Sequence, residues 1–115
     1  MRASEIERTW DALAAGRLSV QRCRCGTQRF STGQFCRACG SSDWSWADLD
    51  GQGLVHSYTI VHRPRGRPTT LVLVDVSDVR ILGVLRARRT PRIGAAVEVV
   101  PNARRKGPIT FRLLD

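Results

Sequence analysis

The hydrophobic pattern of the chain changes once, from helical spacing at the N-terminus to alternation of the kind found in strands. Ile6, Trp10 and Leu13 recur at helical spacing and would lie on one face of a short helix that ends at Gly16. A helix of this length is marginal by itself. We therefore expect its apolar face to pack, either on its own domain or on a partner chain. In the second case Ile6, Trp10 and Leu13 are partner-packing residues.

Downstream of the glycines at 51 and 53, the pattern becomes repeatedly strand-like. Short apolar runs are separated by turn signals and predict five strands, over residues 54–62, 70–76, 79–85, 96–100 and 109–114. Five closely spaced strands indicate a small barrel. An OB-fold fits this count, because it is a five-stranded barrel, and the count alone also allows an SH3-like barrel. The chain is thus predicted to be mainly β.

All four cysteines lie between these two parts, in two clusters. Cys23 and Cys25 form the first cluster and Cys36 and Cys39 the second, and a glycine follows each. Such pairs are typical of the two knuckles of a zinc ribbon, in which four thiolates surround one Zn²⁺. Four thiolates leave no open coordination position, so the predicted zinc, one per chain, is structural.

The first knuckle has only one residue between its cysteines, one fewer than the usual spacing. Three interpretations stay open. The cysteines hold a structural zinc, or the ribbon keeps its shape without metal, or the thiols form a disulfide or redox pair. The first is favoured. The disulfide is the least favoured, because nothing marks the chain as secreted and cytosolic thiols are kept reduced.

The segments around the cysteines complete the predicted ribbon. Residues 17–22 alternate as a strand, and residues 27–35 form a connecting hairpin with Phe30 and Phe35 packed around the cysteines. Trp44 and Trp46 are two residues apart, on one face of an extended segment. They could form a platform for ligand stacking, but we favour the interpretation that they cover the junction with the barrel. The predicted divisions are an N-terminal helix over 1–16, a zinc ribbon over 17–50 and a barrel over 51–115.

Composition adds two constraints. The chain has 115 residues with 42% hydrophobic residues, enough for one small folded unit, and no apolar run of membrane-spanning length. The N-terminus also lacks the apolar core of a signal peptide, so a cytoplasmic location without membrane contact is expected. The formal charge is +9, and residues 51–115, with twelve basic and four acidic residues, contribute +8 of it. Such a surface attracts phosphates or acidic partners.

Two loops of the predicted barrel concentrate this charge. They are expected either to be solvated hairpin tips or to form a rim that binds a partner or phosphates, because proline and glycine keep them out of the sheet. A third basic group, Arg86 to Arg92, follows the third strand. The candidate partner-binding or phosphate-binding residues are Arg63, Arg65, Arg67, Arg104, Arg105 and Lys106.

No catalytic motif accompanies these features. His56, Tyr58 and His62 are separated by even numbers of residues along the first barrel strand and would share a face, but no carboxylate lies near them in sequence. We expect them to be structural, and we expect the chain to have no catalytic residues and not to be an enzyme by itself.

Laid end to end, the chain resembles a family of small acyl-CoA-associated proteins in which a rubredoxin-like zinc ribbon precedes an OB-fold. The resemblance covers nearly the whole chain. Its most specific part is the strand Ser57-Tyr58-Thr59-Ile60-Val61-His62-Arg63-Pro64 after a ribbon. The other matching motifs are Trp10 with Gly16-Arg17-Leu18, Gln21-Arg22-Cys23, Cys36-x-x-Cys39-Gly40-Ser41, Gly51-Gln52-Gly53, and Pro91-x-Ile93-Gly94 with Val97-Glu98-Val99-Val100.

The resemblance implies a non-catalytic accessory subunit of a thiolase-like or ketosynthase-like enzyme. In such complexes the partner carries the nucleophile, while the ribbon and barrel stabilise it and help wall the channel for an acyl-CoA or acyl-carrier substrate. The loop from Arg63 to Arg67 would then lie near the partner or the coenzyme phosphates. Two departures from the family pattern are the short first knuckle and a shorter, arginine-rich segment after Pro64.

The alternative is a module that binds single-stranded nucleic acid, since OB-folds bind single strands with basic grooves and stacked aromatic side chains. The predicted barrel contains only Tyr58 and Phe111 as aromatic residues. This is a poor stacking platform, so nucleic acid is the less favoured partner.

Overall fold

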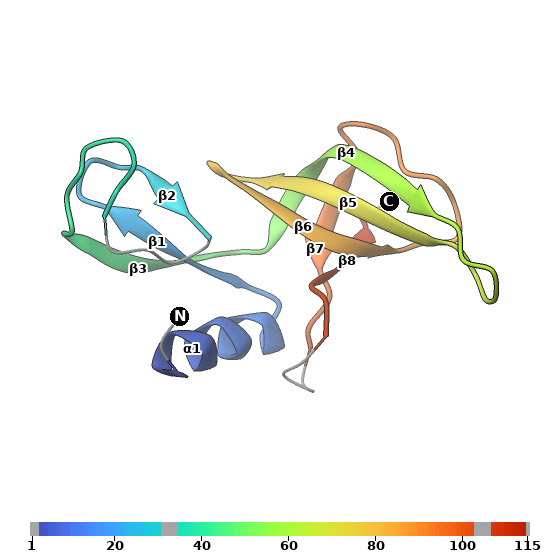
Figure 1. The fold of residues 1–115 in the computed structure, drawn as a ribbon, viewed down its shortest axis with the longest axis horizontal. Coiled ribbons are helices and arrows are strands. Elements are labelled where there is room, and N and C mark those ends of the chain that lie inside the picture. The colour runs from blue at the N-terminus through green and yellow to red at the C-terminus, as the bar shows by residue number, and fades with distance from the viewer. Residues whose placement is uncertain (1–2, 31–34, 103–106, 115) are drawn as a thin grey trace.

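The N-terminal part of the chain is a helix followed by a small sheet. The computed structural model describes residues 3–30, 35–102 and 107–114. Helix α1 spans Ala3–Ala14, and Gly16, at φ +75°, allows the sharp turn into the sheet. Strand β1 (Leu18–Cys23) pairs antiparallel with β2 (Gln28–Arg29) on one side and β3 (Trp44–Leu49) on the other (Figure 1).

The C-terminal part is a closed five-stranded barrel. Its strands are β4 (Gln52–Val61), β5 (Thr69–Val76), β6 (Val79–Arg86), β7 (Ala96–Val99) and β8 (Thr110–Leu113). Around the barrel they follow the order β4-β5-β6-β8-β7, with β6 and β8 parallel and the other pairs antiparallel. This is the arrangement of an OB-fold. The predicted mainly β fold, with a short helix and a five-stranded OB-fold barrel, is confirmed.

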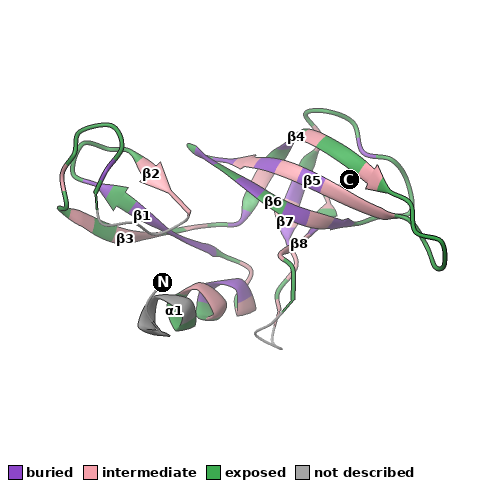
Figure 2. Ribbon diagram, in the orientation of Figure 1, coloured by how far each residue is buried: buried purple, intermediate pink, exposed green. Residues whose placement is uncertain are grey.

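One buried core joins the three parts of the chain. Leu13 of α1, Leu18 and Val20 of β1, and the inward side chains of the barrel belong to the same cluster, with Phe111 fully buried in the barrel (Figure 2). The burial of apolar side chains from both sides stabilises the helix, the sheet and the barrel as one body. The sequence pattern therefore changes at residues 51–53, but the hydrophobic core continues from the ribbon into the barrel.

Two close backbone approaches depend on glycine. A Cβ atom on Gly51, which has φ +79°, would lie 2.4 Å from the carbonyl oxygen of Gly16, so the turn after α1 rests directly on the start of the barrel. A Cβ atom on Gly83 would lie 2.6 Å from the ring of Phe111. The barrel can therefore hold this aromatic ring only because strand β6 has no side chain at that position.

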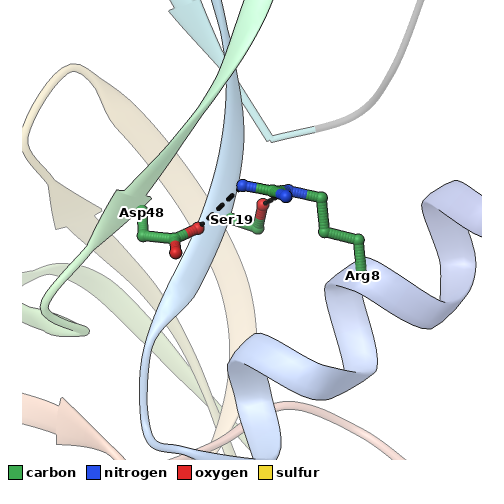
Figure 3. A network of polar contacts seen from close by, with 3 residues as sticks. All are labelled: Arg8, Ser19 and Asp48. Atoms are coloured by element: carbon green, nitrogen blue, oxygen red, sulfur yellow. Dashed lines mark hydrogen bonds and ion pairs between the residues drawn. The ribbon is translucent and has the colours of Figure 1, made fainter.

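Helix α1 is fixed to the sheet by polar contacts of Arg8 as well as by its apolar face. The guanidinium donates a hydrogen bond to the Ser19 hydroxyl at 2.9 Å and lies 3.4 Å from the Asp48 carboxylate (Figure 3). It also lies over the ring of Trp46, with its carbon 5.2 Å from the ring centroid. The contact of Trp46 is thus with the helix, and its ring packs edge-on against Trp44.

The predicted partner-packing residues fall on this helix. Leu13 is 3% exposed and lies in the chain's own core, which leaves almost none of its surface for a partner. Trp10 is half-buried and packs against the same core. The side chain of Ile6 lies outside the described residues. Leu13 and Trp10 thus pack on the chain's own domain, which is the first of the two interpretations given for the apolar face of this helix.

One of the two predictions for the aromatic residues between the knuckles is wrong. Phe35 is 58% exposed, so it does not pack around the cysteines. Phe30 is partly buried and packs against the hydrophobic core that the ribbon shares with the barrel. Nothing in the local sequence pattern distinguishes an aromatic ring that covers the cysteines from one that reaches the neighbouring barrel.

Candidate metal centre

Two similar turns hold the four cysteines. Cys23 ends strand β1, and its carbonyl accepts a hydrogen bond from the Gly26 amide at 2.9 Å. In the second turn the Cys36 carbonyl accepts from the Gly40 amide at 2.8 Å. Both glycines have φ in the left-handed region, +94° and +76°. A residue without a Cβ atom takes this conformation without strain, which is why a glycine closes each knuckle.

The four sulfur atoms form a compact group. The Sγ atoms of Cys23 and Cys39 lie 3.5 Å apart, and those of Cys25 and Cys36 lie 3.8 Å apart. All four lie within 4.8 Å of one another. Four ligands at a Zn–S distance of about 2.3 Å in a tetrahedron are separated by about 3.8 Å. The cysteines are therefore positioned to bind one metal ion, as predicted.

The geometry also bears on the disulfide, one of the three interpretations left open for the thiols. All four cysteines are free, and their closest sulfur atoms, 3.5 Å apart, are far beyond the disulfide bond length of about 2.05 Å. The disulfide interpretation is wrong for this structure. The short first knuckle does not prevent convergence, since Cys25 reaches the second knuckle as closely as a tetrahedral site requires.

Hydrogen bonds and burial shift the pKa values of Cys23, Cys25 and Cys36 in different directions. Hydrogen bonds from the side chain and backbone of Thr27 lower the pKa of Cys25 to about 6. Backbone amides of Cys39 and Ala38 lower the pKa of Cys36. For Cys23 the Cys25 amide also acts to lower the pKa, but burial and hydrogen bonds with the other thiols raise it to about 12. A metal ion that binds all four as thiolates must therefore displace at least the Cys23 proton.

The predicted basic site residues lie away from the cysteines. Arg63, Arg65 and Arg67 are exposed in the loop between β4 and β5, at the end of the barrel that is farther from the ribbon (Figure 1). Arg104, Arg105 and Lys106 lie outside the described residues. The structure thus does not bring the first basic loop near the metal centre.

The barrel also holds a polar group that the sequence did not indicate. His56 Nδ1 lies 3.5 Å from the carboxylate of Asp75, and Arg80 Nε donates to the other oxygen of that carboxylate at 2.7 Å. The hydrogen bond from Arg80 is the main cause that lowers the pKa of Asp75. Pairing between β4 and β5 supplies this carboxylate, and only the strand register could have revealed it.

A β-bulge changes the predicted face of Tyr58. The register of β4 shifts between Val55 and Ser57, so Tyr58 lies opposite the buried Val72, whereas His56 contacts the outward Asp75. The prediction that His56 and Tyr58 share a face is therefore wrong. Even spacing along a strand implies a common face only where no residue is inserted.

Comparison with known proteins identifies the family. Residues 10–45 match the family model described as ChsH2, rubredoxin-like zinc ribbon domain. A solved structure described as Ltp2-ChsH2(DUF35) aldolase contains a chain that is 30% identical, with a TM-score of 0.73, and the match covers 93% of this chain and 92% of that one. This chain belongs to the ChsH2 (DUF35) family. The predicted rubredoxin-like zinc ribbon and OB-fold are thereby confirmed.

Two further proteins resemble this chain, one in sequence and one in fold. A probable enoyl-CoA hydratase alpha subunit of Thermomonospora curvata is 41% identical over 74 residues, which are 60% of this chain and 23% of that protein. The present chain thus spans about a quarter of the length of that curated relative. A DUF35 protein of unknown function from Sulfolobus solfataricus, 15% identical with a TM-score of 0.71, covers 97% of this chain and 87% of its own and shares the fold.

The structure gives one finding on membranes. Among the described residues, no helix combines the length and the apolar character that are needed to cross a bilayer.

Proposed function

We propose that this ChsH2-family chain is a non-catalytic accessory subunit of a thiolase-like enzyme that acts on an acyl thioester. The observation that carries this proposal is the structural match to a chain of a structure described as an Ltp2-ChsH2(DUF35) aldolase, which covers 93% of the present chain and 92% of the matched one. The subunit stabilises its partner and helps shape the channel for the acyl-CoA or acyl-carrier substrate. The name of the Thermomonospora curvata relative, an enoyl-CoA hydratase alpha subunit, supports the acyl-CoA context.

The chemistry of the described residues favours a non-catalytic accessory role over a catalytic one. The candidate metal centre offers four cysteine ligands, and a zinc ion held by four protein ligands would have no open position for water or substrate. The candidate proton-transfer group, His56 with Asp75, lies on the outer face of the barrel, and both side chains are about 40% exposed, at 43% and 40%. A proton-transfer group at a water-filled surface lacks the positioning that catalysis requires.

The nucleic-acid alternative finds little support in the barrel. Base stacking needs exposed aromatic rings. Phe111 is fully buried, and Tyr58 is 37% exposed. On the outer face of β5 and β6, the strands that OB-folds use for such ligands, the exposed Leu82 and the ion pair of Asp75 with Arg80 replace a stacking surface.

The proposal is tested by isolating the tagged full-length chain from the cells that produce it and identifying what accompanies it in stoichiometric amount. We expect a thiolase-like protein, retained in moderate salt, with one zinc per copy of this chain by elemental analysis. A matched control is a tagged Cys25→Ser variant, which should lose zinc and, through the weakened fold, part of the partner. Recovery of the intact, zinc-loaded chain alone would contradict the proposal.

A further inference from the structure

The two cysteine knuckles share a hydrogen-bond pattern that extends one residue beyond the glycine of each. In the first knuckle the Cys23 amide donates to the Thr27 carbonyl at 2.8 Å. In the second the Cys36 amide donates to the Ser41 carbonyl, also at 2.8 Å. Thr27 and Ser41 therefore occupy equivalent positions, and each carries a hydroxyl group.

These two hydroxyl groups make different contacts. The Cys25 thiol donates a hydrogen bond to the Thr27 hydroxyl, with 3.2 Å between Sγ and Oγ1. The Ser41 hydroxyl instead accepts a hydrogen bond from the Asp43 amide at 3.0 Å, in the turn that leads into strand β3. Of these two described hydroxyl groups, that of Thr27 is the one that contacts a sulfur atom.

The sulfur atom that Thr27 contacts belongs to the more vulnerable part of the site. Cys25 lies in the short knuckle and is exposed, whereas Cys23 and Cys36 are buried. Water and competing ligands reach an exposed ligand before a buried one. In the regular knuckle the sulfur of Cys36 already has a backbone donor, the Ala38 amide at 3.4 Å. A side-chain donor at Cys25 would thus support the ligand that needs support most.

Metal binding reverses the direction of the contact between Cys25 and Thr27. A cysteine that binds a metal as thiolate has lost its hydrogen, so its sulfur can only accept. At the same 3.2 Å separation the hydroxyl becomes the donor, and this needs only a rotation of its hydrogen. A hydrogen bond to an ionised acceptor is also stronger than one between neutral groups. The contact therefore gains strength when the metal is bound.

We propose that Thr27 is a positioning residue of the metal centre. Its hydroxyl donates to the Cys25 sulfur and keeps that sulfur in place as a ligand, while its carbonyl holds the backbone of Cys23. One residue thus fixes both cysteines of the short knuckle and compensates for the residue that this knuckle lacks. The inference concerns metal retention by the chain itself and does not depend on the accessory role.

The test measures the zinc affinity of the full-length chain by competition with a chromogenic chelator. Thr27→Val removes the hydroxyl and keeps the shape of the side chain, and because Thr27 is exposed, the variant is expected to fold. Its zinc dissociation constant should rise about tenfold, as is usual when a partner of a metal ligand is lost. Thr27→Ala should behave like Thr27→Val, and Thr27→Ser, which keeps the hydroxyl, should restore the affinity of the parent.

The matched control is Ser41→Ala, the equivalent change in the other knuckle. It removes a hydroxyl that bonds an amide and not a sulfur, so the dissociation constant should change by less than about twofold. An equal loss of affinity in Ser41→Ala and Thr27→Val would overturn the inference in favour of a general loosening of the turns. Unchanged affinity in Thr27→Val, or a Thr27→Ser variant as weak as Thr27→Val, would overturn it as well.

Two further readouts separate a sulfur contact from a purely structural role. With Co²⁺ in place of Zn²⁺, the sulfur-to-cobalt charge-transfer absorption of Thr27→Val should move to longer wavelength, because a thiolate without its hydrogen bond gives up electrons more easily. In the zinc-loaded protein, iodoacetamide should modify Cys25 faster in Thr27→Val than in the parent. Cys39, the other exposed thiol, is the internal reference and should keep its rate. An unshifted absorption and an unchanged rate at Cys25 would contradict the proposed hydrogen bond.

Discussion

The Sγ atom of Cys25 lies 3.8 Å from that of Cys36, although Cys25 belongs to a knuckle that is one residue short. This is the separation of two thiolates on a tetrahedral zinc with bonds of about 2.3 Å. The missing residue in the first knuckle therefore does not prevent the sulfur separation that a tetrahedral metal site requires. Cys23, the last residue of strand β1, makes the second contact between the two knuckles, since its Sγ lies 3.5 Å from that of Cys39.

Zinc content and stability should depend on Cys25 as much as on the cysteines of the regular knuckle. We expect the Cys25→Ser and Cys39→Ser variants each to lose most of their zinc and about 3 kcal/mol or more of unfolding free energy, because metal binding is coupled to folding. Elemental analysis and chemical denaturation measure both. Arg37→Ala, an exposed change between Cys36 and Cys39, should keep one zinc per chain. A fully zinc-loaded Cys25→Ser protein would refute the four-thiolate site.

Arg8 should contribute more to stability than an ordinary exposed arginine. Its guanidinium bonds the buried Ser19 hydroxyl and lies over Trp46. The Arg8→Ala variant should therefore lose about 1–2 kcal/mol in chemical denaturation. The Arg8→Lys variant should lose part of this, because an ammonium cannot make the forked contact. The exposed pair with Asp48 adds little. If Arg8→Ala unfolds at the same denaturant concentration as the parent, the contacts of Arg8 with Ser19 and Trp46 do not contribute to stability.

Gly83 should tolerate no side chain. The Cβ atom of an alanine there would lie 2.6 Å from the Phe111 ring and 2.7 Å from the Ile109 carbonyl oxygen. Gly83→Ala is expected to cost about 3 kcal/mol or more, because the ring is held in a closed core. Gly66→Ala provides the comparison, since open space surrounds that position and its positive φ alone costs about 1 kcal/mol. Thermal unfolding of the two variants ranks them, and equal losses would contradict the packing described for the barrel.

Stability below pH 4 should reveal the Asp75 ion pair. The hydrogen bond from Arg80 lowers the pKa of Asp75 from its ordinary value of 3.8, so the pair stabilises the fold above that pH and is lost as the pH falls through the lower folded-state value. Since both side chains are about half exposed, at 40% and 52%, solvent screens the pair and Asp75→Asn should lower stability only slightly at pH 7. The difference between parent and variant should shrink toward zero near pH 2. A difference that stays constant with pH would rule out this electrostatic origin.

Sequence patterns predicted the elements of this fold better than the contacts between them. The five barrel strands and the four-cysteine cluster depend on local periodicity and spacing, which the sequence displays directly. The pairing of Asp75 with His56 depends instead on strand register, and the bulge near His56 moves Tyr58 to the other face. Likewise, only the folded chain shows that Phe30 packs on the shared core while Phe35 is exposed.

The accessory role is tested most directly by the turnover of an acyl-CoA substrate by a purified thiolase-like partner, measured with and without this chain. We predict no turnover by this chain alone, low turnover by the partner alone, and an increase that saturates when the chain is added in stoichiometric amount. The Cys25→Ser variant should give a smaller increase. Turnover by the isolated chain, or a partner whose activity and stability are unchanged by its addition, would contradict the account.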